Sequence, residues 1–404
     1  MKRLNQNILV FIISALIIFS GLFSKALWAG IKDSALEFLV GVSEDGVFKS
    51  FSCFSDNMEK ISSEKLSYHS LFMDINSVFL NSVNTKVVVK DSTAVVKTSS
   101  GYLANPRPLM KWEELEDRAD KVRGIYEMAE RNNAKFLYVM APSKGYSLNY
   151  PSNIEDFTKE NCDNFAISLK NRDIPNLNLI EKKSEQGITD EEMFFITDHH
   201  WRPEYALWAS GEICKELDRL YGFEYDKKLT DISNYEIKTY KDWFLGSQGK
   251  KVGSYFTSLG RDDINIILPK FETSLSEAQP LKNHYREGAF SDTVMYMENI
   301  EKRDLYNLNP YVSYSGGDFR EQIITNKLKP DGAKVLLIRD SFACAAAPFL
   351  SLNTKSLYIT DVRDYEYYVG SKINVYEYIE KIKPDYVLVL YNGISTGEDL
   401  FDFD

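Results

Sequence analysis

Residues Val335–Phe342 read Val-Leu-Leu-Ile-Arg-Asp-Ser-Phe, an apolar run that ends in a serine just before a predicted helix. An uninterrupted apolar run of this length, bounded by polar residues, is typical of a buried strand. Strands and helices then alternate to the end of the chain, with strands at Val335–Ile338, Ser356–Thr360 and Tyr386–Tyr391 and helices at Phe342–Leu350 and Val375–Ile382. Alternation at this spacing predicts a parallel sheet with right-handed crossovers, and therefore an α/β fold.

The preceding sequence predicts more of the same sheet and its helices. Apolar residues recur at helical spacing after Pro203, and Lys86–Lys90 and Ala94–Lys97 read as a valine-rich hairpin. Further helices are predicted at Trp112–Arg131 and Asn164–Lys170, and further strands at Lys135–Met140 and Leu177–Ile180. From about 223 to 328 the pattern changes to a β-rich insertion, with strands predicted at Tyr235–Tyr240, Ile264–Phe271 and Thr293–Met297.

The N-terminus has the pattern of a membrane anchor. Lys2 and Arg3 precede Ile8–Phe23, an almost wholly apolar run. The large residues Leu27 and Trp28 interrupt the best small-residue site for signal-peptide cleavage. We therefore expect residues 1–30 to remain as a single-pass transmembrane segment. The positive N-terminus then stays inside and the rest is extracytoplasmic. Cleavage as a secretory signal is the alternative, and it would release the protein.

The remaining chain divides into a predicted helical stalk at 31–85 and a catalytic domain at 86–404 that contains the insertion. A formal net charge of −11 argues against a nucleic-acid partner, which would require a basic face. The four cysteines are scattered without a CxxC spacing, so neither a zinc site nor a disulfide framework is predicted.

Thr197–Trp201 reads Thr-Asp-His-His-Trp and holds two of the four histidines in the chain. An imidazole beside a carboxylate is a usual general-base arrangement, and Asp198 is placed to orient His200. A metal site built from Asp198, His199 and His200 is an alternative, but the other two histidines lie in no ligand-like cluster. We therefore predict no metal and no cofactor.

Ser341 is the candidate nucleophile for this base. A serine between a buried strand and a helix projects its hydroxyl at the carboxyl edge of the sheet, near the free N–H groups of the helix start. Such donors stabilise an oxyanion during acyl transfer. The alternative is that Asp340 or Ser341 is only a helix N-cap, a position that suits both residue types. Lys144, in a loop that follows another predicted strand, is a second candidate for this edge.

Several short motifs, in this order, resemble the DHHW family, whose members are similar to SGNH-hydrolase-like alginate O-acetyltransferases. The motifs are the valine hairpin with Gly101-Tyr102-Leu103, Pro142-Ser143-Lys144, Asp198-His199-His200-Trp201, Arg339-Asp340-Ser341-Phe342, Pro348-Phe349-Leu350, Asp361-Val362-Arg363 and Tyr391-Asn392. The resemblance implies an SGNH-hydrolase-like parallel sheet, with Asp198 as the orienting carboxylate, His200 as the base and Ser341 as the nucleophile. Arg363 and Asn392 lie just after predicted core strands and could line the site, with a structural salt bridge or cap as the alternative. The further candidates for lining the site are Lys144, Asp340, Arg339 and His199.

Two residues depart from the family pattern. Arg339 stands where SGNH enzymes commonly have a glycine, which puts the usual oxyanion arrangement in question, and Cys344 stands where we expect a polar residue. The resemblance implies an acetyltransferase that modifies a surface glycan, with a multi-pass membrane acyltransferase as the donor partner. An esterase with the same triad and a non-catalytic glycan-binding protein of the same fold are the alternatives.

Overall fold

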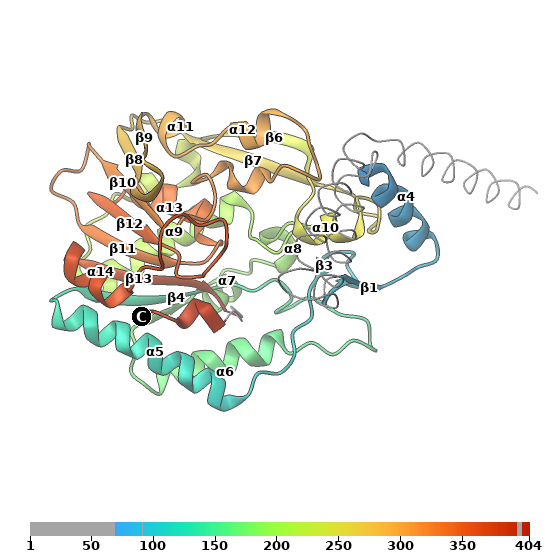
Figure 1. Cartoon of the computed structure of the whole chain (residues 1–404), viewed down its shortest axis with the longest axis horizontal. Coiled ribbons are helices and arrows are strands. Elements are labelled where there is room, and N and C mark those ends of the chain that lie inside the picture. Colours follow the sequence, from blue (N-terminus) through green and yellow to red (C-terminus); the bar gives the residue numbers. More distant parts are fainter. Residues whose placement is uncertain (1–68, 91, 394–397) are drawn as a thin grey trace, which may run out of the picture. The chain divides into compact units, whose positions relative to one another are not determined.

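The computed structural model of the chain describes residues 69–90, 92–393 and 398–404 (Figure 1). The predicted anchor at 1–30 and most of the predicted stalk lie outside these described residues. Among the helices that the structure describes, none is long and apolar enough to span a bilayer.

The described residues divide into two compact units, 69–84 with 253–256, and the described part of 85–252 with 257–404. In the first unit, helix α4 (His69–Ser82) is bonded to the short segment 253–256. The backbone N–H of Ser254 donates to Asp74 Oδ1 at 3.1 Å, and that of Tyr255 donates to Ser77 Oγ at 3.1 Å.

The second unit contains a small sheet, a large sheet, a two-stranded ribbon and their helices. Its strands are β1 (Val87–Lys90), β2 (Thr93–Lys97), β3 (Leu103–Ala104), β4 (Lys135–Ala141), β5 (Asn176–Asn178), β6 (Tyr235–Phe244), β7 (Asp262–Pro269), β8 (Leu275–Gln279), β9 (His284–Gly288), β10 (Glu321–Asn326), β11 (Lys334–Arg339), β12 (Ser356–Thr360) and β13 (Tyr386–Asn392). Its α-helices are α5 (Trp112–Arg131), α6 (Thr158–Lys170), α7 (Leu179–Glu185), α8 (Asp190–Met193), α9 (Pro203–Tyr221), α10 (Ser247–Val252), α11 (Phe290–Thr293), α12 (Glu298–Glu301), α13 (Ala343–Ser351) and α14 (Val375–Ile382).

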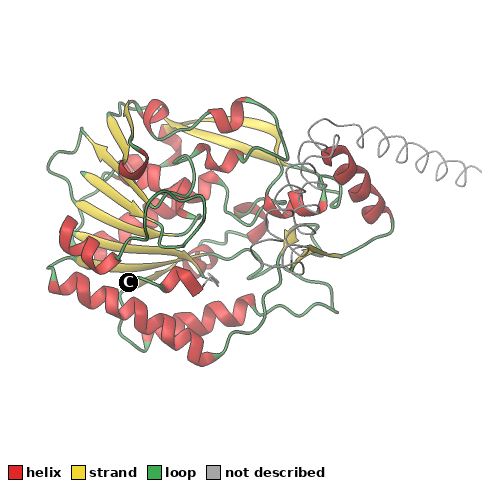
Figure 2. Ribbon diagram, in the orientation of Figure 1, coloured by secondary structure: helices red, strands yellow, loops and turns green. Residues whose placement is uncertain are grey.

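The large sheet has the order β5-β4-β13-β11-β12-β10-β8-β9. Its first five strands are parallel, as the strand–helix alternation predicts, and the last three pair antiparallel. Side chains of the parallel strands alternate between two cores. Leu137 and Val139 enter the core formed with α9 and α13, whereas Phe136 and Tyr138 enter the core formed with α5, α6 and α14. Figure 2 shows helices on both faces of this sheet.

The predicted β-rich insertion is not a separate sheet. Strands β8, β9 and β10 extend the large sheet, and only β6 and β7 form their own antiparallel ribbon. The strand predicted at Thr293–Met297 is wrong, because the short helix α11 precedes one isolated bridge between Met295 and Tyr314. Phe290 and Val294, four residues apart and both buried, fit one face of a helical turn.

The strand predicted at Leu177–Ile180 is correct only in its first part. Strand β5 ends at Asn178, and helix α7 begins at the next residue. The Asn178 side chain accepts from the backbone N–H of Ile180 at 3.0 Å, so it caps the helix. Asparagine is a preferred N-cap residue, and this local hydrogen bond stops the strand.

The strand register aligns the ends of the central strands. Arg339 of β11 pairs with Leu390 of β13, so Ser341 and Asn392, each two residues further along, lie level at the carboxyl edge. Asn392 in turn pairs with Ala141 at the end of β4. Ligands of parallel α/β sheets bind at this edge, outside the carboxyl ends of the strands.

Candidate active site

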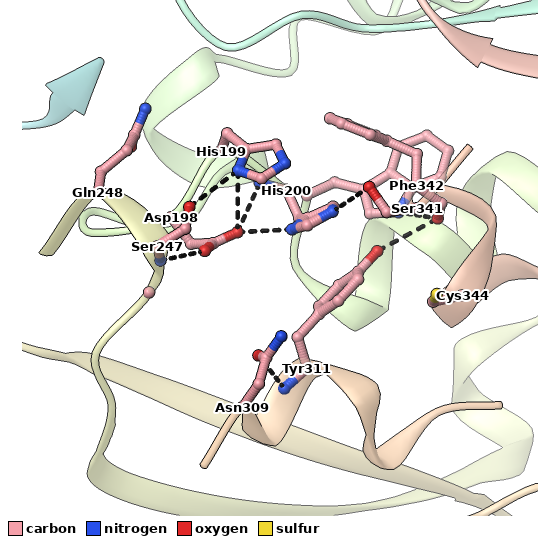
Figure 3. Close-up of polar contacts among 12 residues, drawn as sticks. Asp198, His199, His200, Ser247, Gln248, Asn309, Tyr311, Ser341, Phe342 and Cys344 are labelled. Atoms are coloured by element: carbon pink, nitrogen blue, oxygen red, sulfur yellow. Dashed lines mark hydrogen bonds and ion pairs between the residues drawn. The ribbon is translucent and has the colours of Figure 1, made fainter. Parts of the chain in front are cut away.

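Asp198, His200 and Ser341 form one hydrogen-bonded chain at the carboxyl edge of the sheet (Figure 3). His200 Nδ1 lies 2.6 Å from Asp198 Oδ1, and His200 Nε2 lies 2.8 Å from Ser341 Oγ. Asp198 and His200 are buried, whereas Ser341 is partly exposed. The imidazole thus lies between a carboxylate and a hydroxyl in the order of a serine–histidine–aspartate triad.

Asp198 is held by the backbone as well as by the imidazole. Its Oδ1 accepts from the backbone N–H of His200 at 3.0 Å, and its Oδ2 accepts from the backbone N–H of Ser247 at 2.6 Å. Burial raises the pKa of Asp198, but the nearby His200 and His199 and these hydrogen bonds outweigh burial and hold the pKa well below its usual range. Asp198 therefore remains a carboxylate that fixes the tautomer of His200.

Gly246 provides the space in which Asp198 lies. A Cβ at position 246 would lie 2.6 Å from the Cα of Asp198 and closer still to its Cβ. No larger residue fits there without moving the backbone of the Asp198 loop. This glycine lets the segment before α10 approach closely enough for Ser247 to donate to the carboxylate.

Asp262, at the start of β7, holds the residues just before Asp198. Its Oδ2 accepts from both the backbone N–H and the hydroxyl of Thr197, at 2.8 and 2.6 Å, and its Oδ1 accepts from the N–H of Ile196 at 2.6 Å. The Thr197 hydroxyl also accepts from the N–H of Gly246 at 2.9 Å. The buried Asp262 carboxylate thus joins the strand of the insertion to the Asp-His loop.

Lys144 supports this loop from the protein interior. It is 5% exposed, and its Nζ donates to the carbonyl oxygens of Ile196 and Asp198 at 2.9 and 2.8 Å and to Gln248 Oε1 at 3.0 Å. Burial lowers the pKa of Lys144 to about 7, against the effect of nearby carboxylates. With three acceptors on one ammonium, Lys144 positions the loop and presents no free N–H to a ligand.

Tyr311 and Trp201 fix the orientation of His200 and of the turn after Ser341. The Tyr311 ring stacks on the His200 ring with centroids 4.2 Å apart and an interplanar angle of 16°. The Tyr311 hydroxyl and Trp201 Nε1 both donate to the carbonyl oxygen of Phe342, at 3.2 and 3.1 Å. The base and the nucleophile turn are therefore connected through one buried tyrosine.

Neither Asp340 nor Ser341 is the N-cap of α13, since Phe342 holds that position without a side-chain cap, and Asp340 instead holds the turn before the helix. Asp340 Oδ1 accepts from the N–H of Phe342 at 3.0 Å, and Oδ2 accepts from the N–H of Asn392 at 2.7 Å. Two of the N–H donors predicted at the helix start are used within this turn, since Ala343 donates to Asp340 O and Cys344 to Ser341 O. These two N–H groups are therefore satisfied by carbonyl oxygens within the same short turn. Among the described residues, the Ser341 N–H has no acceptor.

Asn392 joins the end of β13 to the loop after β4. Its Oδ1 accepts from the Ser143 hydroxyl at 2.7 Å, and its Nδ2 donates to Pro142 O at 3.1 Å. Asn392 is partly exposed. Its backbone N–H donates to Asp340, the residue just before Ser341. The Pro-Ser-Lys loop and the Asp-Ser turn are thereby held at one edge.

Arg339 and Arg363 form an ion-pair cluster beside the nucleophile turn. Arg339 is 1% exposed, contacts Asp318 at a very short separation and lies 3.8 Å from Asp361. Arg363 contacts the same two carboxylates and donates from Nε to Asp361 Oδ1 at 2.8 Å. Cys344 Sγ also lies in this cluster, 3.1 Å from Asp318 Oδ1. Arg339 and Cys344, the departures from the family pattern, are thus partners of one partly buried carboxylate, Asp318.

His199 lies beside the triad and outside the hydrogen-bonded chain. Its side chain is 43% exposed, and its Nδ1 lies 3.0 Å from Ser247 Oγ. Partial burial and the neighbouring His200 lower the pKa of His199. Asp198, His199 and His200 offer three ligand atoms within 4.8 Å of one another. Both ring nitrogens of His200 are already engaged, so metal binding there would have to break the chain to Ser341.

Sequence reasoning missed four parts of this site: Asp262, the Gly246–Gln248 segment, Tyr311 and Asp318. Each lies in the region that we predicted as an insertion. Ser247 contacts Asp198, Asp262 contacts Thr197 and Tyr311 contacts His200, whereas Asp318 contacts Arg339. The two glycines around Ser247-Gln248 are the one local signal, because glycines mark close backbone approach.

The fold and the arrangement of Asp198, His200 and Ser341 define an α/β protein with a serine–histidine–aspartate site. The sequence matches no protein-family model and no curated protein. The fold is similar to that of Bacillus cereus PatB1 with a sulfonyl adduct, with a TM-score of 0.63 and 22% identity over 79% of this chain and 99% of that one. It is also similar to a DHHW family protein from Eubacterium siraeum, with a TM-score of 0.55 and 17% identity over 78% and 95% of the two chains. The predicted resemblance to the DHHW family is therefore confirmed at the level of the fold.

Proposed function

We propose that this protein is an O-acetyltransferase that transfers an acetyl group to a hydroxyl of a cell-surface polysaccharide through an acyl-serine at Ser341. The observation that carries the proposal is the hydrogen-bonded chain from Asp198 through His200 to Ser341, at 2.6 and 2.8 Å. A hydroxyl within this distance of an imidazole, which a carboxylate in turn orients, is the usual geometry of an activated serine.

In the first half of the reaction, Ser341 Oγ attacks the carbonyl carbon of the donor ester while His200 Nε2 takes the hydroxyl proton. The tetrahedral intermediate collapses, the ester C–O bond breaks, and the leaving oxygen takes the proton from His200. The acetyl group is then attached to Ser341. Asp198 remains ionised throughout and stabilises the imidazolium, since its pKa lies well below its usual range.

In the second half, a sugar hydroxyl of the acceptor gives its proton to His200 and attacks the acetyl carbon. The bond to Ser341 Oγ breaks and the serine recovers its proton from His200, so the reaction needs no cofactor. Oxyanion stabilisation is a large part of acyl transfer. The backbone N–H of Ser341, which has no acceptor among the described residues, is the donor that we assign to the oxyanion.

A sulfonyl adduct is present on PatB1, which shares this fold. Sulfonyl electrophiles form covalent adducts with activated nucleophiles, and an activated serine is the nucleophile that we propose here. The sequence resemblance to the DHHW family supports acetyl as the transferred group. We further propose that residues 1–30 anchor the protein with the catalytic unit outside the cytoplasm, where a membrane acyltransferase delivers the acetyl donor.

The test uses the fragment from residue 31 onward, p-nitrophenyl acetate as the donor and a soluble glycan as the acceptor. Mass spectrometry follows acetyl on the Ser341 peptide and on the glycan, in the parent and in Ser341→Ala and His200→Ala. We expect both variants to lose about 10⁴-fold or more in rate. Ser351→Ala is the matched control, because this hydroxyl, at the end of the helix that follows Ser341, donates only to Pro348 O.

If Ser341→Ala and His200→Ala retain the parent rate, the proposed triad is wrong. The partial exposure of Ser341 admits water to an acyl-serine, so the same experiment also tests the esterase. Release of acetate without any acetylated glycan would identify an esterase in place of a transferase. Glycan binding with no acetyl on Ser341 would identify a non-catalytic protein.

A further inference from the structure

The loop between β12 and α14 carries three tyrosines that pack ring against ring. The rings of Tyr365 and Tyr367 are nearly parallel, with centroids 5.0 Å apart and an interplanar angle of 13°. Tyr368 stands edge-on to both rings. Tyr367 is 62% exposed although it belongs to this ordered stack. Exposed aromatic clusters on a surface loop mark binding surfaces, because they fill no core.

Arg363 holds Tyr365 in place. Its Nη1 donates to the Tyr365 hydroxyl at 2.7 Å, and its Cζ lies 4.8 Å from the ring centroid. The same guanidinium is fixed by Asp361 and Asp318. The ring is therefore oriented by an arginine that two carboxylates already immobilise.

Arg320 holds the other side of the loop. It is 3% exposed, its Cζ lies 5.0 Å from the centroid of the Tyr368 ring, and its Nη2 lies 3.0 Å from Asp364 Oδ1. With anchors at Asp364 and at Tyr368, the stack is ordered before any ligand binds. Ordering on folding removes part of the entropy cost of binding.

The strand register places this loop beside the nucleophile. Ile338 of β11 pairs with Thr360 of β12, so Ser341 and Arg363, each three residues further along, lie level at the carboxyl edge. Arg339 also contacts Asp318, which Arg363 contacts as well. The loop that carries the tyrosine stack therefore begins at the same sheet edge as Ser341.

We propose that the Tyr365–Tyr367 stack is the acceptor subsite and binds a sugar ring of a neutral polysaccharide. This inference rests on the proposed function. A tyrosine face packs against the C–H face of a sugar, and its hydroxyl and the neighbouring carboxylates accept hydrogen bonds from sugar hydroxyls. Asp364 and Glu366 are exposed on the same loop, and the chain has a net charge of −11. These charges repel a polyuronate and favour an uncharged acceptor.

The test measures equilibrium binding by calorimetry without any acetyl donor, with cellopentaose as the neutral probe and an oligogalacturonate as the anionic probe. The variant is Tyr367→Ala, and the matched control is Tyr285→Ala, a tyrosine on β9 that is equally exposed at 61%. Loss of one stacking ring raises the dissociation constant of cellopentaose about tenfold. Tyr367→Phe keeps the ring and restores most of the affinity.

Unchanged cellopentaose affinity in Tyr367→Ala would overturn the subsite, as would an equal loss in Tyr285→Ala. Tighter binding of the oligogalacturonate than of cellopentaose would overturn the neutral ligand class. The proposed function fails by a different measurement, the absence of acetyl on Ser341 in the parent. The calorimetric test of sugar binding uses no acetyl donor, so its outcome does not depend on whether Ser341 is acetylated.

Discussion

Replacing Gly246 with alanine is expected to impair catalysis by displacing Asp198. The new Cβ would lie 2.6 Å from the Cα of Asp198 and closer to its Cβ, and ordinary contact begins at 3.4 Å, so the backbone must move by at least about 0.8 Å. The N–H of Ser247, now 2.6 Å from Asp198 Oδ2, is part of the segment that has to move. A misplacement of about 1 Å costs on the order of 10²-fold in rate.

The assay is the initial rate of p-nitrophenyl acetate turnover, together with thermal unfolding to separate catalysis from stability. Gly211→Ala is the matched control, because this glycine lies inside α9 and the new Cβ would meet nothing closer than Thr230 Cβ at 3.2 Å. We expect about 10²-fold loss of kcat in Gly246→Ala and no loss in Gly211→Ala. A Gly246→Ala protein that folds and turns over at the parent rate would refute the claim that this glycine positions the carboxylate.

Three further variants test the parts that hold the site. Asp198→Asn no longer fixes the tautomer of His200, so kcat should fall by about 10⁴-fold with the fold retained, as checked by circular dichroism. Lys144→Met removes the donor to Asp198 O and Gln248 Oε1 in the protein interior, while Ile196 O keeps the N–H of Leu103, so urea unfolding should show a loss of roughly 2–4 kcal/mol; an unchanged midpoint would contradict this role. Burial raises the pKa of Asp318, but the nearby Arg339 and Arg363 outweigh burial and lower this pKa to about 2. Above pH 4 the ionised Asp318 carboxylate therefore contributes about 2 kcal/mol to the free energy of unfolding, and this contribution is lost as the pH falls toward 2. The difference in unfolding free energy between the parent and Asp318→Asn should shrink over the same range.

The parallel half of the fold was predictable because its signals are local. Helix α5 begins and ends where the amphipathic pattern of Trp112–Arg131 predicts, and β12 matches the predicted Ser356–Thr360. In these segments the apolar residues of the pattern, apart from Trp112 at the start of α5, face a core, so periodicity and burial agree.

The antiparallel half of the sheet was not predictable from periodicity. Strand β8 buries Leu275, Glu277 and Gln279 on one face, so polar residues stand where apolar ones are expected. Glu277 is satisfied there by Gln322 and Tyr296, at 3.0 and 2.6 Å. A buried polar network of this kind depends on partners far away in the sequence, and no local pattern reveals it.

The candidate site was predictable only in part, namely for the residues whose signals are local. Asp198 and His200 are two residues apart, and Ser341 stands at a strand–helix junction, so each is visible locally. Asp262 contacts Thr197, and Tyr311 contacts His200, only because the chain returns to this loop after a long excursion. Their residue types are those of ordinary strand and core positions, which explains why sequence reasoning placed neither of them in the site.

The most direct test of the central claim is the rate at which a sulfonyl fluoride modifies Ser341, followed by mass spectrometry. His200→Ala removes the ring nitrogen that lies 2.8 Å from the Ser341 hydroxyl. His199→Ala removes the adjacent imidazole, which lies outside that chain and contacts Ser247. The account predicts rapid modification of Ser341 in the parent and in His199→Ala, and loss of modification in His200→Ala. Equal modification in all three proteins would contradict the activation of Ser341 by His200.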